Sequence, residues 1–170
     1  MSISQYFNID KKLVIGLMFA CHSLLAGCQE VETKESSVPV SAAEAKNVLQ
    51  GTMPIPDSAS DVRYRLSGST QDWDLFISYH APHKDIEQII NQELKRLINR
   101  ELRISGASLQ FDKQPLSSST LPSSIEFRAP KWWKPLSIKN GYYIGSSNPD
   151  SGARFWIDQK EEIVYFYDHF

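Results

Sequence analysis

The chain has 170 residues, of which 41% are hydrophobic and 22% are charged, and its formal net charge is −2. This length and apolar content suit one domain with a single core. The weak negative charge excludes the broad basic face that binding to nucleic acid requires, so we expect no nucleic-acid partner.

The start of the chain carries the most specific signal in the sequence. Lys11 and Lys12 precede the apolar run LVIGLMFACHSLL. A membrane-spanning helix needs about 20 apolar residues, so this run is too short to be one. A charged start, a short apolar segment and then small residues are the layout of a secretory signal peptide. We therefore predict that residues 1–27 are removed from the mature protein.

A cysteine distinguishes this signal from an ordinary one. The sequence LAGC, which ends at Cys28, resembles the lipobox of bacterial lipoproteins. This resemblance covers residues 1 to about 29 and implies that Cys28 carries diacylglycerol and becomes the first mature residue. The alternative is an ordinary secretory signal that is cut near Ala20 or Ala26. Because Gln29 rather than Asp follows the cysteine, the pattern resembles that of lipoproteins sent to the outer membrane, facing the periplasm if the envelope is Gram-negative.

Residues 28–53 are expected to form a tether. The segment QEVETKESSVPV is polar and charged, which is typical of a mobile linker. The segment SAAEAKNVLQG has Ser41 as a possible cap and Glu44 three residues later, so a short helix is possible at 41–50. We place the single folded domain at residues 54–170.

The first part of this domain shows two kinds of periodicity. Residues 61–66 and 73–80 alternate between apolar and polar side chains on either side of the turn sequence SGSTQD, which predicts a hairpin. Phe76 falls on the opposite face from its apolar neighbours, so the second strand is expected to be covered on both faces. Residues 83–103 have isoleucine and leucine at helical spacing, which predicts one main amphipathic helix.

The second half of the domain is rich in strand patterns. A Ser-rich segment predicts a long surface loop with one short strand near 109–112. The segments SIEFRAP, GYYIGSS, ARFWIDQ and EEIVYFYD then alternate or are rich in aromatic residues, and each is expected to be a strand. The sequence thus predicts an α+β fold, an antiparallel sheet of about five to six strands with one main helix (about 83–103) on one face.

Aromatic residues are concentrated in the last 40 residues. Consecutive aromatic residues in a strand must point to opposite faces, so they cannot all enter one core. Either the segment KWWKP closes the second face of the sheet, or some of these side chains form a surface that stacks on a sugar or anchors a protein. Because the two tryptophans of KWWKP are adjacent, we expect one of each kind. The candidate binding residues are Trp132, Trp133, Tyr142, Tyr143 and Trp156.

The sequence contains no recognisable catalytic set. It has no G-x-S-x-G motif and no Gly-rich phosphate loop, and its two cysteines belong to the signal and the lipobox. The pair His80 and His83 is a weak metal signal because a strand-to-helix junction does not fix the two side chains on one face. We therefore predict no catalytic residues, no metal, no cofactor and no enzyme.

A second, less specific resemblance covers residues 54–67 and 152–168. The segments PIPDSASDV and RFWIDQKEEIVYFYD resemble parts of small uncharacterised bacterial envelope lipoproteins, which implies no function. Some periplasmic immunity proteins share this size and lipid anchoring. We expect a lipid-anchored envelope lipoprotein with a non-catalytic binding domain, protein-binding or immunity-like. The alternative is a module that binds peptidoglycan or another glycan, and a periplasmic hydrolase comes third.

Overall fold

The computed structural model describes residues 32–50, 53–68, 72–106, 110–116, 122–146 and 153–169. Cys28 and the predicted signal peptide lie outside these ranges. The described residues belong to one compact unit that begins at Glu32. Within them, no helix has both the length and the apolar character needed to cross a membrane.

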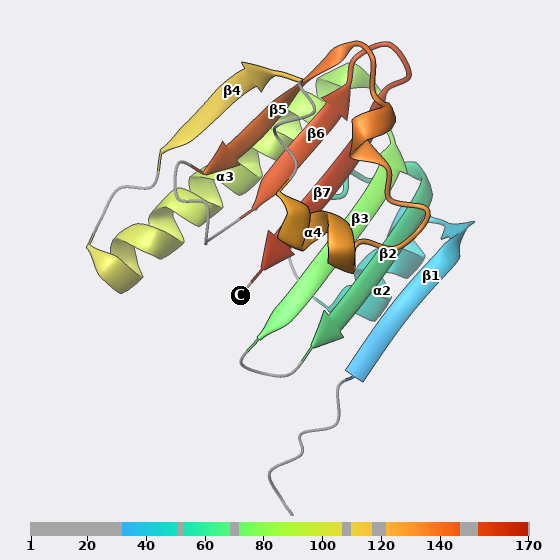
Figure 1. Ribbon diagram of the computed structural model, residues 1–170, viewed down its shortest axis with the longest axis horizontal. Helices are drawn as coiled ribbons and strands as arrows, with labels where there is room; N and C mark the ends of the chain where they lie inside the picture. The colour runs from blue at the N-terminus through green and yellow to red at the C-terminus, as the bar shows by residue number, and fades with distance from the viewer. Residues whose placement is uncertain are drawn as a thin grey trace, which may run out of the picture. The chain divides into compact units, whose positions relative to one another are not determined.

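The described residues form one antiparallel sheet of seven strands in the order β1-β2-β3-β7-β6-β5-β4 (Figure 1). The predicted α+β class is confirmed, and the sheet has slightly more strands than expected. The strands are β1 (Glu32–Val40), β2 (Ser60–Gly68), β3 (Trp73–His80), β4 (Phe111–Pro115), β5 (Gly141–Ser146), β6 (Arg154–Asp158) and β7 (Ile163–His169).

β1 corrects the predicted tether. It pairs with β2 from Glu32 opposite Gly68 to Val40 opposite Val62, with one irregularity in register. Most of its side chains are exposed, because an edge strand is held by backbone hydrogen bonds and contributes few side chains to the core. The prediction of a mobile linker up to residue 53 is therefore wrong from Glu32 onward, and the folded domain begins there.

Two helices cover one face of the sheet, α2 (Ala42–Leu49) and α3 (His83–Ser105) (Figure 1). The possible short helix is confirmed as α2, where Ser41 Oγ accepts a hydrogen bond from the backbone N–H of Glu44 at 3.2 Å. The main predicted helix is confirmed as α3, which ends at Gly106 with a φ of 70°. Together the helices and the sheet bury the larger core, which includes Tyr64, Ile77, Ile86, Ile90, Leu97 and Phe166.

The opposite face of the sheet lies under a covering segment, residues 122–140, which contains α4 (Ser123–Arg128) and the 3₁₀ turn η2 (Pro135–Ser137). The strand predicted at 124–130 is wrong, because a four-residue alternation also fits a short helix that buries Ile125 and exposes Phe127. Both faces of β3 are covered, as expected. The second core consists of Phe76, Ile125, Trp133, Trp156 and Tyr167.

Candidate functional site

An open cleft of about 490 Å³ lies on the helix side of the molecule. It is bounded by α2, by the segment that leads into β2 and by the first half of α3. We call it the helix-side cleft. Its lining residues are Lys46, Ile55, Pro56, Asp57, Ser58, Asp85, Gln88, Ile89 and Gln92.

The walls of the helix-side cleft are fixed by polar contacts between elements. Lys46 Nζ lies 2.6 Å from Asp57 Oδ1, and this contact lowers the pKa of the Asp57 carboxyl group. Ser58 Oγ donates a hydrogen bond to Asp85 Oδ2 at 2.5 Å, which joins the segment before β2 to α3. The half-buried Ile89 contributes apolar surface above the buried Ile55, while Gln88 and other side chains offer donors and acceptors.

The aromatic residues proposed as a binding surface belong largely to the cores. Trp133 is only 3% exposed, and its ring meets Trp156 edge-on at 5.1 Å and Phe76 at 5.2 Å. Tyr142 is buried in the helix-side core, and Tyr143 is half-buried against Trp156 at 5.2 Å. A recognition surface made by all these aromatic residues is therefore wrong, because Trp133 and Trp156 are buried in the second core and Tyr142 is buried in the helix-side core.

The two tryptophans of KWWKP differ in burial, although both pack against the second core. Trp133 is buried, whereas Trp132 is half-buried at the rim of the second core. The Trp132 indole Nε1 donates a hydrogen bond to Glu35 Oε1 of β1 at 3.2 Å. This contact ties the covering segment to the edge strand.

A cluster of polar side chains, which we call the Asp74 cluster, holds α4 against the sheet. Arg128 Nη1 donates to the Asp74 carboxylate at 2.9 Å, and Arg128 Nη2 donates to the Tyr167 hydroxyl at 3.0 Å. The Tyr167 hydroxyl in turn donates to Asp74 Oδ1 at 2.9 Å. Burial and the contact with Asp74 raise the pKa of Tyr167. Sequence reasoning missed this cluster, and no periodic signal marks its members.

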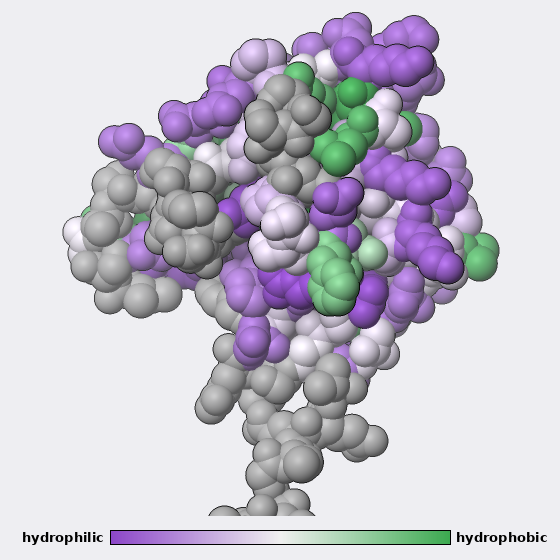
Figure 2. All heavy atoms as spheres, in the orientation of Figure 1, coloured by the Kyte–Doolittle hydropathy of each residue, from purple (hydrophilic) through white to green (hydrophobic). Residues whose placement is uncertain are grey.

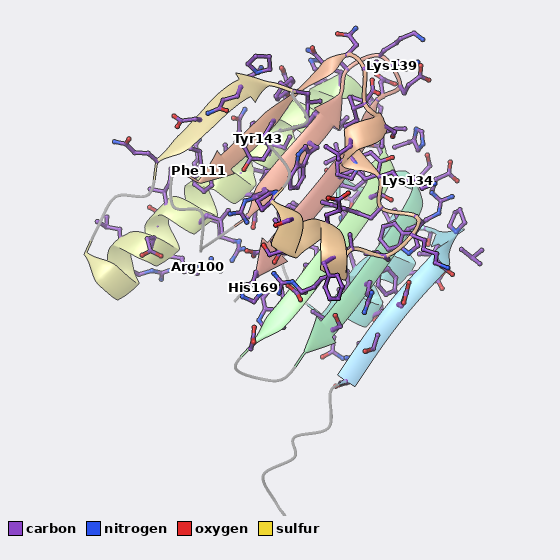
Figure 3. All side chains as sticks on the ribbon, in the orientation of Figure 1. Arg100, Phe111, Lys134, Lys139, Tyr143 and His169 are labelled. Carbon is purple, nitrogen blue, oxygen red and sulfur yellow. The ribbon has the colours of Figure 1, made fainter. Side chains whose placement is uncertain are left out.

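His169 lies beside the Asp74 cluster at the end of β7 (Figure 3). Its Nδ1 lies 3.1 Å from Asp74 Oδ1, and its Nε2 lies 3.5 Å from Asp72 Oδ1. Both ring nitrogens thus lie near carboxylate oxygens, and Nδ1 also lies 3.2 Å from the carbonyl oxygen of Trp73.

The other histidine candidates also have ordinary surroundings. His83 Nε2 lies 3.3 Å from Glu87 Oε1, one helical turn along α3, and the His83 backbone N–H donates to Glu162. His80 lies at the end of β3, opposite Ile163 of β7. Among the residues that the structure describes, no group of three His, Cys, Asp or Glu side chains is placed to hold a metal ion.

A second polar group is buried between α3 and the sheet, beside a cavity of about 150 Å³. Asp168 of β7 is 2% exposed, and Glu93 of α3 is bound to Arg96 through both carboxylate oxygens. Burial raises the pKa of Asp168 to about 6, and the nearby Arg100 partly offsets this rise. Sequence reasoning missed this burial, because an aspartate after three aromatic residues carries no pattern that marks it as buried.

We expect Asp168→Asn to stabilise the domain at neutral and alkaline pH. The folded-state pKa of about 6 lies above the unfolded value of 3.8, so ionisation of Asp168 costs free energy of folding as the pH rises between these values. Above this window the asparagine variant should gain up to about 3 kcal/mol in its free energy of unfolding. Below about pH 4 it should gain little.

Urea unfolding at about pH 4 and about pH 8 measures this difference. The exposed Glu126→Gln serves as the control, because it removes a carboxylate without changing a buried site. An Asp168→Asn variant that is no more stable than wild type at the higher pH would show that Arg100 fully compensates the buried charge.

No protein family, no curated protein and no solved structure matches this chain. Its function therefore has to be inferred from the chemistry of the surfaces described above.

Proposed function

We propose that this protein is a lipid-anchored protein of the cell envelope whose domain binds a protein partner and catalyses no reaction. The observation that carries the proposal is the helix-side cleft. Its volume of about 490 Å³ lies in the range of about 300–1,000 Å³ that is typical of ligand sites. Amide, carboxylate and hydroxyl groups surround a small apolar floor, a lining that suits the backbone and side chains of a partner's loop.

The lining of the cleft favours protein over glycan. Sugar rings are commonly held by stacking on flat aromatic faces. The described residues that line the cleft include no aromatic side chain, and Trp133 and Trp156 are buried elsewhere. A peptidoglycan-binding function thus loses three of the five aromatic residues that suggested it, since Trp133, Tyr142 and Trp156 are buried. A hydrolase comes third, because the sequence contains no recognisable catalytic motif.

The envelope location rests on the resemblance of LAGC to a lipobox. The compact unit begins at Glu32, four residues after Cys28, so the cleavage that this resemblance implies would leave the whole folded domain intact. A small lipid-anchored domain that binds a protein has the format of periplasmic immunity proteins. We therefore favour an immunity-like role at the outer membrane over other binding roles.

Photo-crosslinking in intact cells tests the proposed protein-binding site. A photoreactive amino acid at the exposed position Gln88 is expected to give a discrete adduct with a partner protein, which mass spectrometry can identify. The same amino acid at Asn99, which is exposed on α3 outside the cleft, is the matched control and should give no such adduct.

A second substitution shows whether the adduct depends on the cleft itself. Gln92→Arg, combined with the photoreactive group at position 88, should fill part of the cleft and lower the adduct yield by about tenfold. Because Gln92 is exposed, its replacement should not change the melting temperature. Equal adducts from positions 88 and 99, or an adduct that survives Gln92→Arg, would remove the cleft as the binding site.

A further inference from the structure

We infer that the covering segment, residues 122–140, docks onto the anionic surface of the lipid bilayer, so that the helix-side cleft faces away from the membrane. This inference rests on the lipid anchor of the proposed function. It concerns a different face of the domain from the cleft, and the two surfaces lie on opposite sides of the sheet (Figure 1).

Charge is the first observation that supports this docking. The covering segment contains four basic residues and one acidic residue, whereas the chain from Cys28 onward has a formal charge of about −3. The covering segment is therefore net basic on a domain that is acidic overall, and its three lysines supply this charge because Arg128 is paired with Asp74. Anionic headgroups attract such a cluster over about one Debye length. The basic residues are Arg128, Lys131, Lys134 and Lys139, of which the three lysines are exposed. Figure 3 labels Lys134 and Lys139.

Exposed apolar side chains on the same segment are the second observation. Phe127 is 92% exposed and Leu136 is 45% exposed, while Trp132 is half-buried. Figure 2 shows an apolar patch close to the place where Figure 1 shows α4, surrounded by hydrophilic surface. Aromatic and leucine side chains among lysines are typical of segments that lie in the membrane interface.

The backbone of α4, which carries the exposed Phe127, is fixed to the sheet by Arg128 and Ile125. Arg128 is fixed to Asp74 and Tyr167 across the sheet, and Ile125 on the same short helix is buried in the second core. Phe127 therefore projects from a helix that is attached at two points. It can enter a lipid surface with little loss of its own conformational entropy.

A contact with β1 also fits this orientation. The covering segment meets the strand that follows Cys28 in the sequence, because Trp132 Nε1 binds Glu35 of β1. The opposite face offers less net charge, since α3 carries five Lys or Arg residues against four acidic ones and is nearly balanced.

Vesicle binding by a protein without acyl chains tests the inference independently of the anchor. The probe is the chain from residue 28 onward with Cys28→Ser, mixed with vesicles of phosphatidylglycerol and phosphatidylcholine or of phosphatidylcholine alone. Sedimentation gives the partition coefficient. We expect binding to the anionic vesicles that falls with added salt, and about tenfold weaker binding to the neutral ones.

Paired variants assign this binding to the covering segment. Phe127→Ser and the double variant Lys131→Gln/Lys134→Gln should each lower partitioning into anionic vesicles by about tenfold. The matched controls on α3 are Leu102→Ser, which removes an exposed leucine, and Lys84→Gln/Lys95→Gln, which removes the same charge. These controls should bind as the parent does. All the replaced side chains are exposed, so the melting temperatures should stay unchanged.

Several outcomes would overturn the inference. One is the absence of binding to anionic vesicles. Another is an equal loss of binding for the covering-segment variants and their controls on α3. The last is unchanged vesicle binding of Phe127→Ser together with a protein adduct from a photoreactive group at position 127, which would assign this surface to a protein. None of these outcomes depends on acylation of Cys28, so each is separate from a failure of the lipid anchor.

Discussion

Replacing Trp133 with alanine is expected to lower the free energy of unfolding by about 3–5 kcal/mol, which is a large part of the stability of a small domain. Trp133 is almost fully buried and stacks edge-on against Trp156, Phe76 and Tyr165. Its indole nitrogen is buried without a hydrogen-bond partner among the described residues. The contribution of this side chain is therefore one of apolar packing, and its removal leaves a cavity in the second core.

The neighbouring Trp132→Ala is the matched control for this prediction. Trp132 is half-buried, and its loss removes one exposed hydrogen bond to Glu35 and part of a rim contact. We expect a cost of about 1 kcal/mol. Chemical unfolding of both variants measures the difference. Equal losses for the two variants would show that the covering segment does not close the second core through Trp133.

Replacing Cys28 with alanine is expected to abolish stable membrane attachment or to stall processing of the precursor. Each buried CH₂ of an acyl chain contributes about 0.8 kcal/mol, so two or three chains hold a protein on the bilayer almost permanently. The surface contacts of the covering segment alone are weaker and depend on salt. Fractionation at high salt should therefore find the wild type with the membranes and any processed Cys28→Ala protein in the soluble fraction.

Cys21→Ala provides the matched control, because Cys21 lies within the predicted signal peptide, which the predicted cleavage removes. This variant should incorporate labelled palmitate and remain with the membranes as the wild type does. Label that persists in Cys28→Ala, or that is lost in Cys21→Ala, would contradict the assignment of the lipobox.

The elements with strong periodicity could be predicted from the sequence. The β2–β3 hairpin follows from alternation, and α3 follows from isoleucine and leucine at helical spacing. The split of the aromatic residues between two faces also follows from the strand geometry, since Phe155 and Phe166 enter the larger core while Trp156 and Tyr167 enter the second one.

Other elements could not be predicted, for identifiable reasons. β1 is polar because an edge strand is stabilised by backbone pairing with β2, and hydrophobic periodicity does not register such pairing. The alternation from Ser123 to Arg128 covers only six residues. A pattern this short fits a strand and a short helix equally well. Its identity is decided by the burial of Ile125 and by the contact of Arg128 with Asp74, which are tertiary effects.

The candidate site was the least predictable part. The helix-side cleft combines residues from α2, the segment before β2 and α3, and no local pattern in any of them marks a site. The aromatic residues gave a conspicuous signal, but most of them serve to close the second core. The exposed Phe127 lies in the segment SIEFRAP, whose alternation predicts a strand, and the hydrophobicity of this residue does not show whether anything covers it.

The mass of the N-terminal peptide of the mature protein tests the anchor on which both proposals depend. The protein is isolated from membranes of cells that express it from its own signal, digested, and analysed by mass spectrometry. We predict a peptide that begins at Cys28 and carries a diacylglyceryl group on sulfur, usually with a third acyl chain on the new amino group. A mature chain that begins after Ala20 or Ala26 with an unmodified Cys28 would contradict the account.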